Sequence, residues 1–236
     1  MLEEETLNAA TVPTLSHPGL LVMDVDSTLI DEEVIDELGV AAGVGDRIAS
    51  VTARAMNGEL DFRDALRARV ALLKDLPISM FDDVYHAVHF TNGALALIDA
   101  LHDYGWKVGV VSGGFHEVVD RLASDANIDY WIANRLETAD GRLTGRVLGD
   151  IVTKDVKLES LRTWAGRVGV SMAQTVAVGD GANDLPMLSV AGLGIAFHAK
   201  PKVKATAGQS LSTIGLDGIL YFLGYKDSYL DDKRFV

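Results

Sequence analysis

The chain of 236 residues contains no cysteine. Disulfide bonds and thiolate metal sites are therefore excluded, and the composition suits a reducing compartment, so we expect a cytoplasmic protein. No apolar run approaches the roughly 20 residues that a membrane-spanning helix needs. The N-terminus is acidic and lacks the basic and apolar segments of a secretory signal. We expect neither membrane insertion nor secretion.

Positive charge is also scarce, since 21 Lys and Arg residues stand against 34 Asp and Glu residues and the formal net charge is −13. A surface this negative repels a phosphate backbone, so nucleic-acid binding is not expected. An anionic ligand would need a locally positive pocket, supplied by a metal ion and a few Lys or Arg side chains. Hydrophobic residues make up 48% of the chain, which is enough for one well-packed domain with a sizeable insertion.

Short apolar strands alternate with helical patterns along most of the chain. Strands are expected at residues 20–25, 106–112, 129–133, 175–179 and 193–197. Helices are expected at residues 92–104, 115–126, 155–168, 183–190 and 200–206. This alternation predicts an α/β fold, a Rossmann-like parallel sheet with right-handed crossovers. Ligands of such sheets bind beyond the carboxyl ends of the strands.

One segment, residues 31–90, interrupts the alternation. Amphipathic helices are expected within it at residues 31–42, 46–57, 61–75 and 79–90. Several of them begin at Asp or Ser, which are good N-cap residues. Because the segment follows the first strand directly, we expect a helical cap domain over the ligand site, with residues 19–30 and 91–236 forming the core.

Two shorter segments stand apart from this pattern. Residues 1–18 have no periodicity, and we expect a flexible N-terminal tail there. Residues 135–149 carry Asp140-Gly141 at their centre and are typical of a β-hairpin.

The first strand ends in two carboxylates, Asp24 and Asp26. Because side chains alternate along a strand, residues two apart leave on the same face. Two anions this close raise each other's pKa and require a cation or a reaction to account for them. An Asp-rich turn is the alternative, but the strand at 175–179 also ends in a carboxylate, Asp180. Three such carboxylates form a hard oxygen site that favours Mg²⁺.

Two weaker signals complete a pattern. Ser112 and Gly113 follow the second strand and offer hydrogen-bond donors to an anion, although such a sequence is often only a turn. Lys157 lies near the start of a predicted helix, where Lys154 is an equal candidate by chemistry. A carboxylate nucleophile, a second carboxylate, Mg²⁺, anion donors and a lysine are together what phosphoryl transfer requires.

The order of these motifs resembles the haloacid dehalogenase superfamily over residues 20–225: Asp-x-Asp-x-Thr, then Ser, then Lys, then Gly-Asp-Gly-x-Asn-Asp. Within the superfamily, residues 23–30, 52–62 and 67–70 resemble the phosphoserine phosphatases. The resemblance implies Mg²⁺-dependent hydrolysis of O-phospho-L-serine, with one Mg²⁺ in each active site. A homodimer is compatible with the sequence but cannot be derived from it.

The resemblance also implies roles for single residues. Asp24 would be the nucleophile, Asp26 the general acid and base, and Lys157 rather than Lys154 the catalytic lysine. The metal ligands would be Asp24, Asp26 and Asp180. The remaining positions would hold the substrate or support the site: Thr28, Ser112, Gly113, Asn183 and Asp184.

The substrate's serine moiety would be bound by residues of the insertion. Glu33 would pair with the ammonium group, and Arg69 would bind the carboxylate through its two-pronged guanidinium group. Met56 and Phe62 would form apolar walls. Taken alone, Glu33 and Arg69 would be ordinary exposed residues of helices; only the surrounding motif gives them this role.

Four other functions share parts of the pattern. A phosphotransferase could pass the phosphoryl group from phosphoserine to homoserine or another alcohol, and a phosphatase could act on a different small phosphomonoester. A binding module that has lost catalysis is disfavoured because every expected catalytic position is filled. Ion-pumping ATPases share Gly-Asp-Gly-x-Asn-Asp but need membrane spans, which the sequence does not predict.

Overall fold

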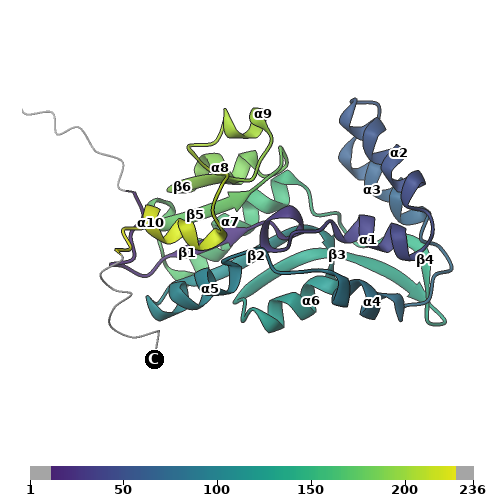
Figure 1. Ribbon diagram of the computed structural model, residues 1–236, viewed down its shortest axis with the longest axis horizontal. Coiled ribbons are helices and arrows are strands. Elements are labelled where there is room, and N and C mark those ends of the chain that lie inside the picture. Colours follow the sequence, from purple (N-terminus) through teal and green to yellow (C-terminus); the bar gives the residue numbers. More distant parts are fainter. Residues whose placement is uncertain (1–11, 227–236) are drawn as a thin grey trace, which may run out of the picture.

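A computed structural model describes residues 12–226 of the chain. Its centre is a sheet in the order β4-β3-β2-β1-β5-β6-β7 (Figure 1). All neighbouring strands are parallel except β3 and β4. The strands are β1 (Leu20–Met23), β2 (Lys107–Phe115), β3 (Tyr130–Ala139), β4 (Arg142–Leu148), β5 (Thr175–Gly179), β6 (Leu193–Phe197) and β7 (Gln209–Leu211). This is the α/β sheet that the sequence predicts.

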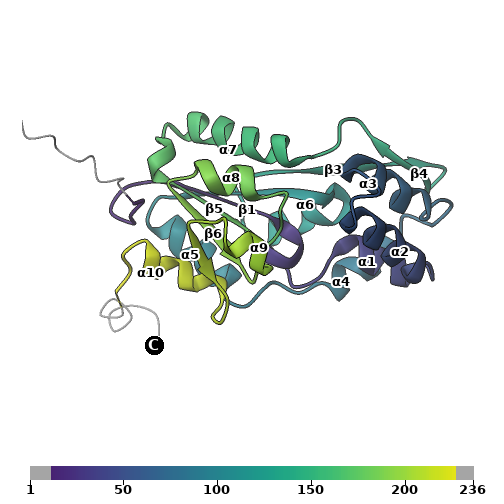
Figure 2. The same cartoon turned by 90° about the horizontal axis from the view of Figure 1, so that it is seen from above.

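Helices cover both faces of the sheet. One face packs against α5 (Ala94–Asp103), α6 (His116–Asp125) and α10 (Ile219–Phe222), and the other against α7 (Lys154–Val168), α8 (Leu185–Val190) and α9 (Pro201–Lys204). Figure 2 shows α7 and α5 on opposite sides of the sheet. Along β1, Leu21 and Met23 belong to one buried cluster and Leu20 and Val22 to the other. A strand buried on both faces is apolar throughout, which is why β1 has no polar alternation.

The second strand differs from its expected form. It continues from residue 112 to Phe115, so Ser112, Gly113 and Gly114 lie within β2, and α6 begins at His116. The extension is held by pairing between Phe115 and Asn134 of β3, beyond a shift of register. The short strand β7 and helix α10 were not expected from the sequence, because each spans only three or four residues and has no clear periodicity.

The insertion forms four helices, α1 (Val34–Ala41), α2 (Gly45–Met56), α3 (Phe62–Ala71) and α4 (Met80–Ala87). Its two ends leave and rejoin the sheet side by side, because Ile30 pairs with Phe90 and the amide of Thr91 donates to the carbonyl of Leu29 at 3.0 Å. Helices α2 and α3 stand at one end of the molecule, opposite α10 (Figure 1).

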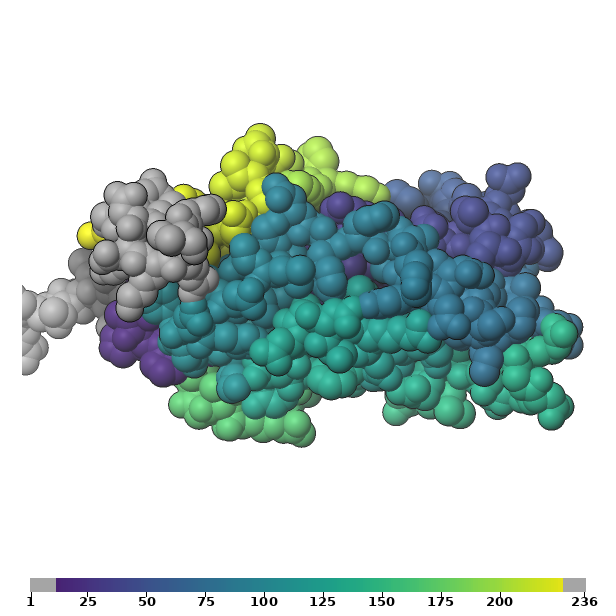
Figure 3. Space-filling model, turned by 60° about the horizontal axis from the view of Figure 1, so that its bottom comes forward, coloured from purple at the N-terminus to yellow at the C-terminus, as the bar shows by residue number. Residues whose placement is uncertain are grey.

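The second half of the insertion is fixed to the rest of the molecule. Asp82 of α4 forms an ion pair of 2.5 Å with Arg121 of α6. The segment between α3 and α4 pairs with the start of β4, where the amide of Leu143 donates to the carbonyl of Leu76 at 2.9 Å. Figure 3 shows the blue surface of this segment and of α4 beside the green-teal surface of the β3–β4 hairpin. By contrast, Ile48 is the one buried residue of α2.

Part of the expected N-terminal tail packs on the core. Residues 1–11 lie outside the described part of the chain, but the buried Leu15 donates through its amide to the carbonyl of Leu223 at 3.0 Å. The side-chain amide of Gln174 also donates to the carbonyl of Thr14 at 2.7 Å. Between residues 12 and 226, every helix is too short or too polar to cross a membrane.

Asp129 joins the starts of β2 and β3. Its carboxylate accepts hydrogen bonds from the ammonium of Lys107 at 2.6 Å and the amide of Val108 at 2.9 Å, and it lies 2.9 Å from Nε2 of His102. Burial alone would raise the pKa of Asp129, but these hydrogen bonds outweigh it and hold the pKa below its usual value. The ionised form of Asp129 therefore stabilises this edge of the core.

We predict that Asp129→Asn lowers the free energy of unfolding by about 1–2 kcal/mol near pH 7, because an amide cannot replace the charged acceptor. Since the folded-state pKa is depressed, the contribution of the carboxylate is present above its unfolded pKa of about 3.9 and is lost as the pH falls through the folded value. Urea denaturation between pH 7 and pH 3 should show the two proteins converging in acid. The control is Asp99→Asn on exposed α5 surface; a difference that does not shrink in acid would contradict the prediction.

Candidate active site

A cavity of about 440 Å³ opens at the carboxyl ends of β1 and β5. In the sheet, β2 is the neighbour of β1 on one side and β5 is its neighbour on the other. The strand order therefore reverses direction between β1 and β5. Such a crevice is the usual ligand site of an open α/β sheet. The charged and amide side chains that line it are Asp24, Asp26, Glu33, Arg69, Asp180 and Asn183.

Asp24 is held at the end of β1 by both the backbone and a lysine. Its amide donates to the carbonyl of Val178 in β5 at 3.0 Å, and its Oδ1 accepts from the amide of Val25 at 2.8 Å. Its Oδ2 lies 2.6 Å from Nζ of Lys157. The side chain is buried at the floor of the cavity. One carboxylate oxygen is thus fixed by an amide and the other by a cation.

Asp26 sits in a tight loop that follows β1. The loop closes through a hydrogen bond of 3.0 Å from the amide of Ile30 to the carbonyl of Val25. Oδ1 of Asp26 accepts from the amide of Val34 at 2.9 Å, and Oδ2 accepts from the hydroxyl of Ser112 at 3.2 Å. Burial, and then the charges of Glu33 and Asp24, raise the pKa of Asp26 to about 7. Asp26 can therefore exchange a proton near neutral pH.

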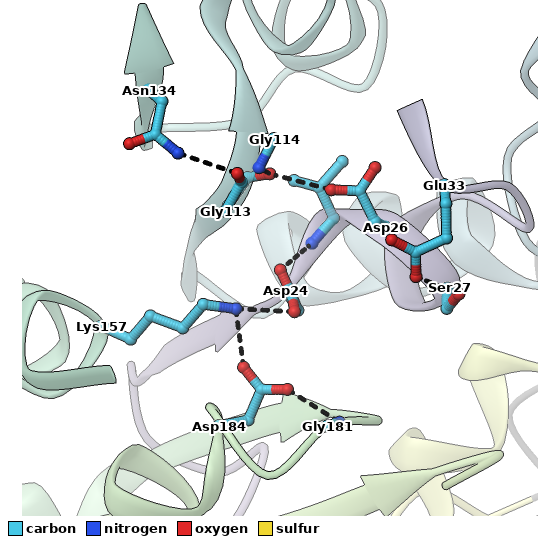
Figure 4. Close-up of polar contacts among 12 residues, drawn as sticks. Asp24, Asp26, Ser27, Glu33, Gly113, Gly114, Asn134, Lys157, Gly181 and Asp184 are labelled. Atoms are coloured by element: carbon cyan, nitrogen blue, oxygen red, sulfur yellow. Dashed lines mark hydrogen bonds and ion pairs between the residues drawn. The ribbon is translucent and has the colours of Figure 1, made fainter. Parts of the chain in front are cut away.

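Lys157 is almost fully buried beneath the cavity. It lies on the inner face of α7 with Leu161, Trp164 and Ala165, at helical spacing, whereas Lys154 is exposed. Its ammonium contacts Asp24 at 2.6 Å and donates to Oδ1 of Asp184 at 2.7 Å (Figure 4). Burial opposes its charge, but the two carboxylates outweigh burial and raise the pKa of Lys157, so the ammonium stays protonated.

Carboxylate oxygens of Asp24, Asp180 and Asp184 lie within 4.8 Å of one another. Burial, and then the charges of Asp24 and Asp184, raise the pKa of Asp180 to about 7. Carboxylates that disfavour one another's charge, and offer only oxygen, fit a small divalent cation such as Mg²⁺. Asp24 and Asp184 each contact Lys157 through one oxygen and a backbone amide through the other, but only Asp24 and Asp180 line the cavity. The carboxylate of Asp26 lies outside this cluster, and the role of Asp26 as a third ligand stays a prediction.

Gly113 and Gly114 line the side of the cavity that β2 forms, and Ser112 is buried directly before them. The Ser112 hydroxyl accepts from the amide of Gly114 at 2.7 Å and donates to Asp26. A Cβ atom at Gly114 would lie 2.8 Å from Oδ2 of Asp26, so the close approach of the Asp26 carboxylate to β2 requires glycine at this position. Asn134 reaches from β3 and donates to the carbonyl of Gly113 at 2.8 Å (Figure 4). The strand end is thereby fixed around Gly113.

The insertion contributes the opposite wall. Glu33 accepts from the hydroxyl of Ser27 at 2.8 Å, and burial raises the pKa of its carboxyl group. Arg69 of α3 is half-buried, and its Nε is shielded from solvent without a hydrogen-bond partner among residues 12–226. Met56 and Phe62 line the cavity mouth, where they are 67% and 39% exposed. Apolar side chains this exposed are free to contact a ligand.

Most predicted residues therefore gather around one cavity. Thr28 lies under the loop after β1, fully buried, and Asn183 lies on the rim with Asp180. Sequence reasoning assigned no role to Asn134 or Leu66, because an asparagine within a strand or a leucine within a helix has many ordinary uses. Gly114, Thr52 and Leu60 stand within the motifs that carry the resemblance but were given no role of their own; the last two line the cavity with Leu66.

Comparison with known proteins gives consistent matches. The sequence model of the haloacid dehalogenase-like hydrolases matches residues 21–189. The phosphoserine phosphatase of Lactococcus lactis subsp. lactis is 56% identical over 209 residues, which cover 89% of this chain and 97% of that protein. The phosphoserine phosphatase of Streptococcus thermophilus is 59% identical over 205 residues, which cover 87% and 95% respectively.

A solved structure matches equally well. A substrate-bound phosphoserine phosphatase complex superimposes with a TM-score of 0.82 at 42% identity, over 88% of this chain and 99% of that one. The match extends over nearly the whole of both chains and therefore includes the insertion as well as the sheet. The chain belongs to the haloacid dehalogenase-like hydrolase family, and within it to the phosphoserine phosphatases.

Proposed function

We propose that this protein hydrolyses O-phospho-L-serine to L-serine and phosphate. The observation that carries the proposal is the pair Glu33 and Arg69, an exposed carboxylate and a half-buried guanidinium group that line the same cavity as Asp24. A zwitterionic substrate needs one anion and one cation, set apart and shielded from water. The names of the relatives and of the substrate-bound structure support the same substrate.

The first half of the reaction transfers the phosphoryl group to the protein. A carboxylate oxygen of Asp24 attacks phosphorus, and the bond between phosphorus and the serine oxygen breaks. Asp26, whose pKa of about 7 allows it to carry a proton, gives that proton to the departing serine oxygen. The product of this half is free serine and an aspartyl phosphate on Asp24.

The second half returns the protein to its starting state. Asp26, now ionised, accepts a proton from a water molecule while the water oxygen attacks phosphorus. The bond between phosphorus and the Asp24 oxygen breaks, so phosphate leaves and the Asp24 carboxylate is restored. Asp26 thus serves as acid and then as base, which requires a carboxyl group that titrates near the working pH.

Charge on the phosphoryl oxygens is stabilised by fixed donors. Lys157, the Ser112 hydroxyl and the Gly113 amide would hold these oxygens, and Lys157 is already fixed between Asp24 and Asp184. Asp24 and Asp180 would hold Mg²⁺, with Asp184 behind them and Asn183 on the rim. When bound, the cation would supply positive charge that offsets the negative charge of the phosphate group and lets an anionic nucleophile approach phosphorus.

Helices α1–α4 are proposed to form a cap domain over the cavity. Glu33 lies where the chain enters the insertion, and Arg69, Met56 and Phe62 lie on α2 and α3. A cap that closes on these residues would exclude bulk water while serine is still attached. Since α3 packs against β4, and α4 and the segment before it are fixed to α6 and β4, closure would involve mainly α2.

We predict that Asp24→Asn abolishes phosphate release from O-phospho-L-serine, with a loss of at least about 10³-fold in kcat, because an amide cannot form the aspartyl phosphate. Phosphate release in the presence of Mg²⁺ measures this loss. The control is Asp31→Asn, an exposed residue of the same loop, which should keep full activity. Wild-type release that is equally fast from sugar phosphates would contradict phosphoserine as the substrate, and transfer to an added alcohol would indicate a phosphotransferase.

We predict that Arg69→Ala lowers kcat/KM for O-phospho-L-serine, since a bidentate pair with the carboxylate is lost. The loss of transition-state stabilisation should be about 2–4 kcal/mol. Phosphoethanolamine has no carboxylate, so its slower turnover should change by less than about threefold. The matched control is Arg67→Ala, because Arg67 is exposed on the same helix and pairs only with Asp64 among the described residues. An equal loss for both substrates would show that Arg69 has another role.

We predict that removing divalent cations with EDTA abolishes turnover and that Mg²⁺ restores it. Added Mg²⁺ should also raise the melting temperature, because it relieves the repulsion among Asp24, Asp180 and Asp184. For Asp180→Asn, the same rise in melting temperature should require about tenfold more Mg²⁺. A melting temperature that does not respond to Mg²⁺ in the wild-type protein would contradict a metal site at these residues.

A further inference from the structure

Asn134 lies on β3, outside the cavity, and is 1% exposed. Its Nδ2 donates to the carbonyl of Gly113 in β2 at 2.8 Å, and its Oδ1 accepts from the amide of Val152 at 2.8 Å. The orientation of the side-chain amide is fixed by these partners, since a carbonyl can only accept and a backbone amide can only donate. One buried side chain therefore joins two segments that are distant in the sequence.

The first of these segments carries Gly113. The peptide between Gly113 and Gly114 is held by two hydrogen bonds. Asn134 donates to its carbonyl, and the Ser112 hydroxyl accepts from its amide at 2.7 Å. Glycine has no side chain that could hold its backbone in place, so its orientation depends on such outside contacts. The two hydrogen bonds set the orientation of the peptide that directly follows Gly113.

The second segment leads into α7. Val152 is followed by Thr153, whose carbonyl accepts from the amide of Lys157 at 3.0 Å. A shift of Val152 would therefore move the first turn of α7, which carries Lys157 under the cavity. Asn134 thus joins Gly113 of β2 to the segment that leads to Lys157 of α7.

We propose that Asn134 is a positioning residue for the phosphoryl group: it fixes Gly113 and Lys157 relative to each other without touching the substrate. The inference rests on the proposed function, in which these two groups hold the same phosphoryl oxygens. Donors placed in advance stabilise a transition state without reorganising, and a displacement of about 1 Å can cost about 100-fold in rate. The phosphate end of the site therefore depends on a residue of β3.

Two substitutions separate the two hydrogen bonds. Asn134→Leu, of similar size, removes both. Asn134→Asp keeps an acceptor for Val152 but, when ionised, repels the carbonyl of Gly113; burial raises the pKa of the new carboxyl group, and its protonated form can donate again. The matched control is Leu136→Ala, two residues along the same strand, which opens a cavity in the core without contacting Gly113 or Val152.

Each variant is measured in two ways with Mg²⁺ present, at a temperature well below its melting point. The first is kcat and KM for O-phospho-L-serine, and the second is the rise in melting temperature that inorganic phosphate produces. We expect Asn134→Leu to lower kcat by about 10- to 100-fold and to weaken phosphate binding by about tenfold. Leu136→Ala should change both by less than about threefold, although it is at least as destabilised.

The pH dependence gives a further check. For Asn134→Asp, the deficit relative to wild type should be largest at pH 8 and should shrink toward pH 5.5, as the new carboxyl group becomes protonated. The proposal is overturned if the loss of kcat in the Asn134 variants is no greater than in a Leu136→Ala protein of similar melting temperature. It is also overturned if phosphate binding by the Asn134 variants is unchanged. If the wild type binds phosphate but does not hydrolyse phosphoserine, only the proposed function fails. If inorganic phosphate does not change the melting temperature of the wild type, the proposed function and the positioning role of Asn134 both fail.

Discussion

The site depends on one buried ammonium group shared by two buried carboxylates. Lys157 contacts Asp24 at 2.6 Å and Asp184 at 2.7 Å, and all three side chains are almost inaccessible to solvent. Removing charges from water is costly, and leaving one buried charge unpaired typically costs about 3–5 kcal/mol. The positions of β1, α7 and the turn before α8 are thus tied together by charge, and the remaining carboxylates are arranged around this group.

In the proposed mechanism, chemistry and substrate selection are carried by different parts of the fold. The sheet supplies Asp24, Asp26, Asp180 and the donors of β2, at the point where the strand order reverses. The insertion supplies Glu33 and Arg69, together with the apolar residues at the mouth of the cavity. The groups on the sheet suit any phosphomonoester, whereas the pair on the insertion suits a zwitterion. A protein built this way recognises the phosphate and the amino acid independently.

The parts of the fold that are encoded locally could be predicted from the sequence. The apolar strand before Asp24 and the glycines around Asp180 stand in short continuous segments, and the resemblance placed Lys157 ahead of Lys154. The parts that depend on tertiary contacts could not. The extension of β2 through Ser112 and Gly113 relies on pairing with Asn134, and the hold on α4 relies on Arg121 of a helix far along the chain. These contacts leave no pattern in the residues that make them.

The paired ends of the insertion have a consequence for how such a protein can change. Ile30 and Phe90 are neighbours in space, so everything between them forms a closed excursion from a single point of the sheet. Lengthening a loop whose ends already meet adds little entropic cost, roughly 0.6 kcal/mol for each doubling. The excursion could therefore be shortened, enlarged or exchanged for another without disturbing the strand that ends at Asp24. Diversification of substrates can proceed at this joint while the reaction itself is inherited unchanged.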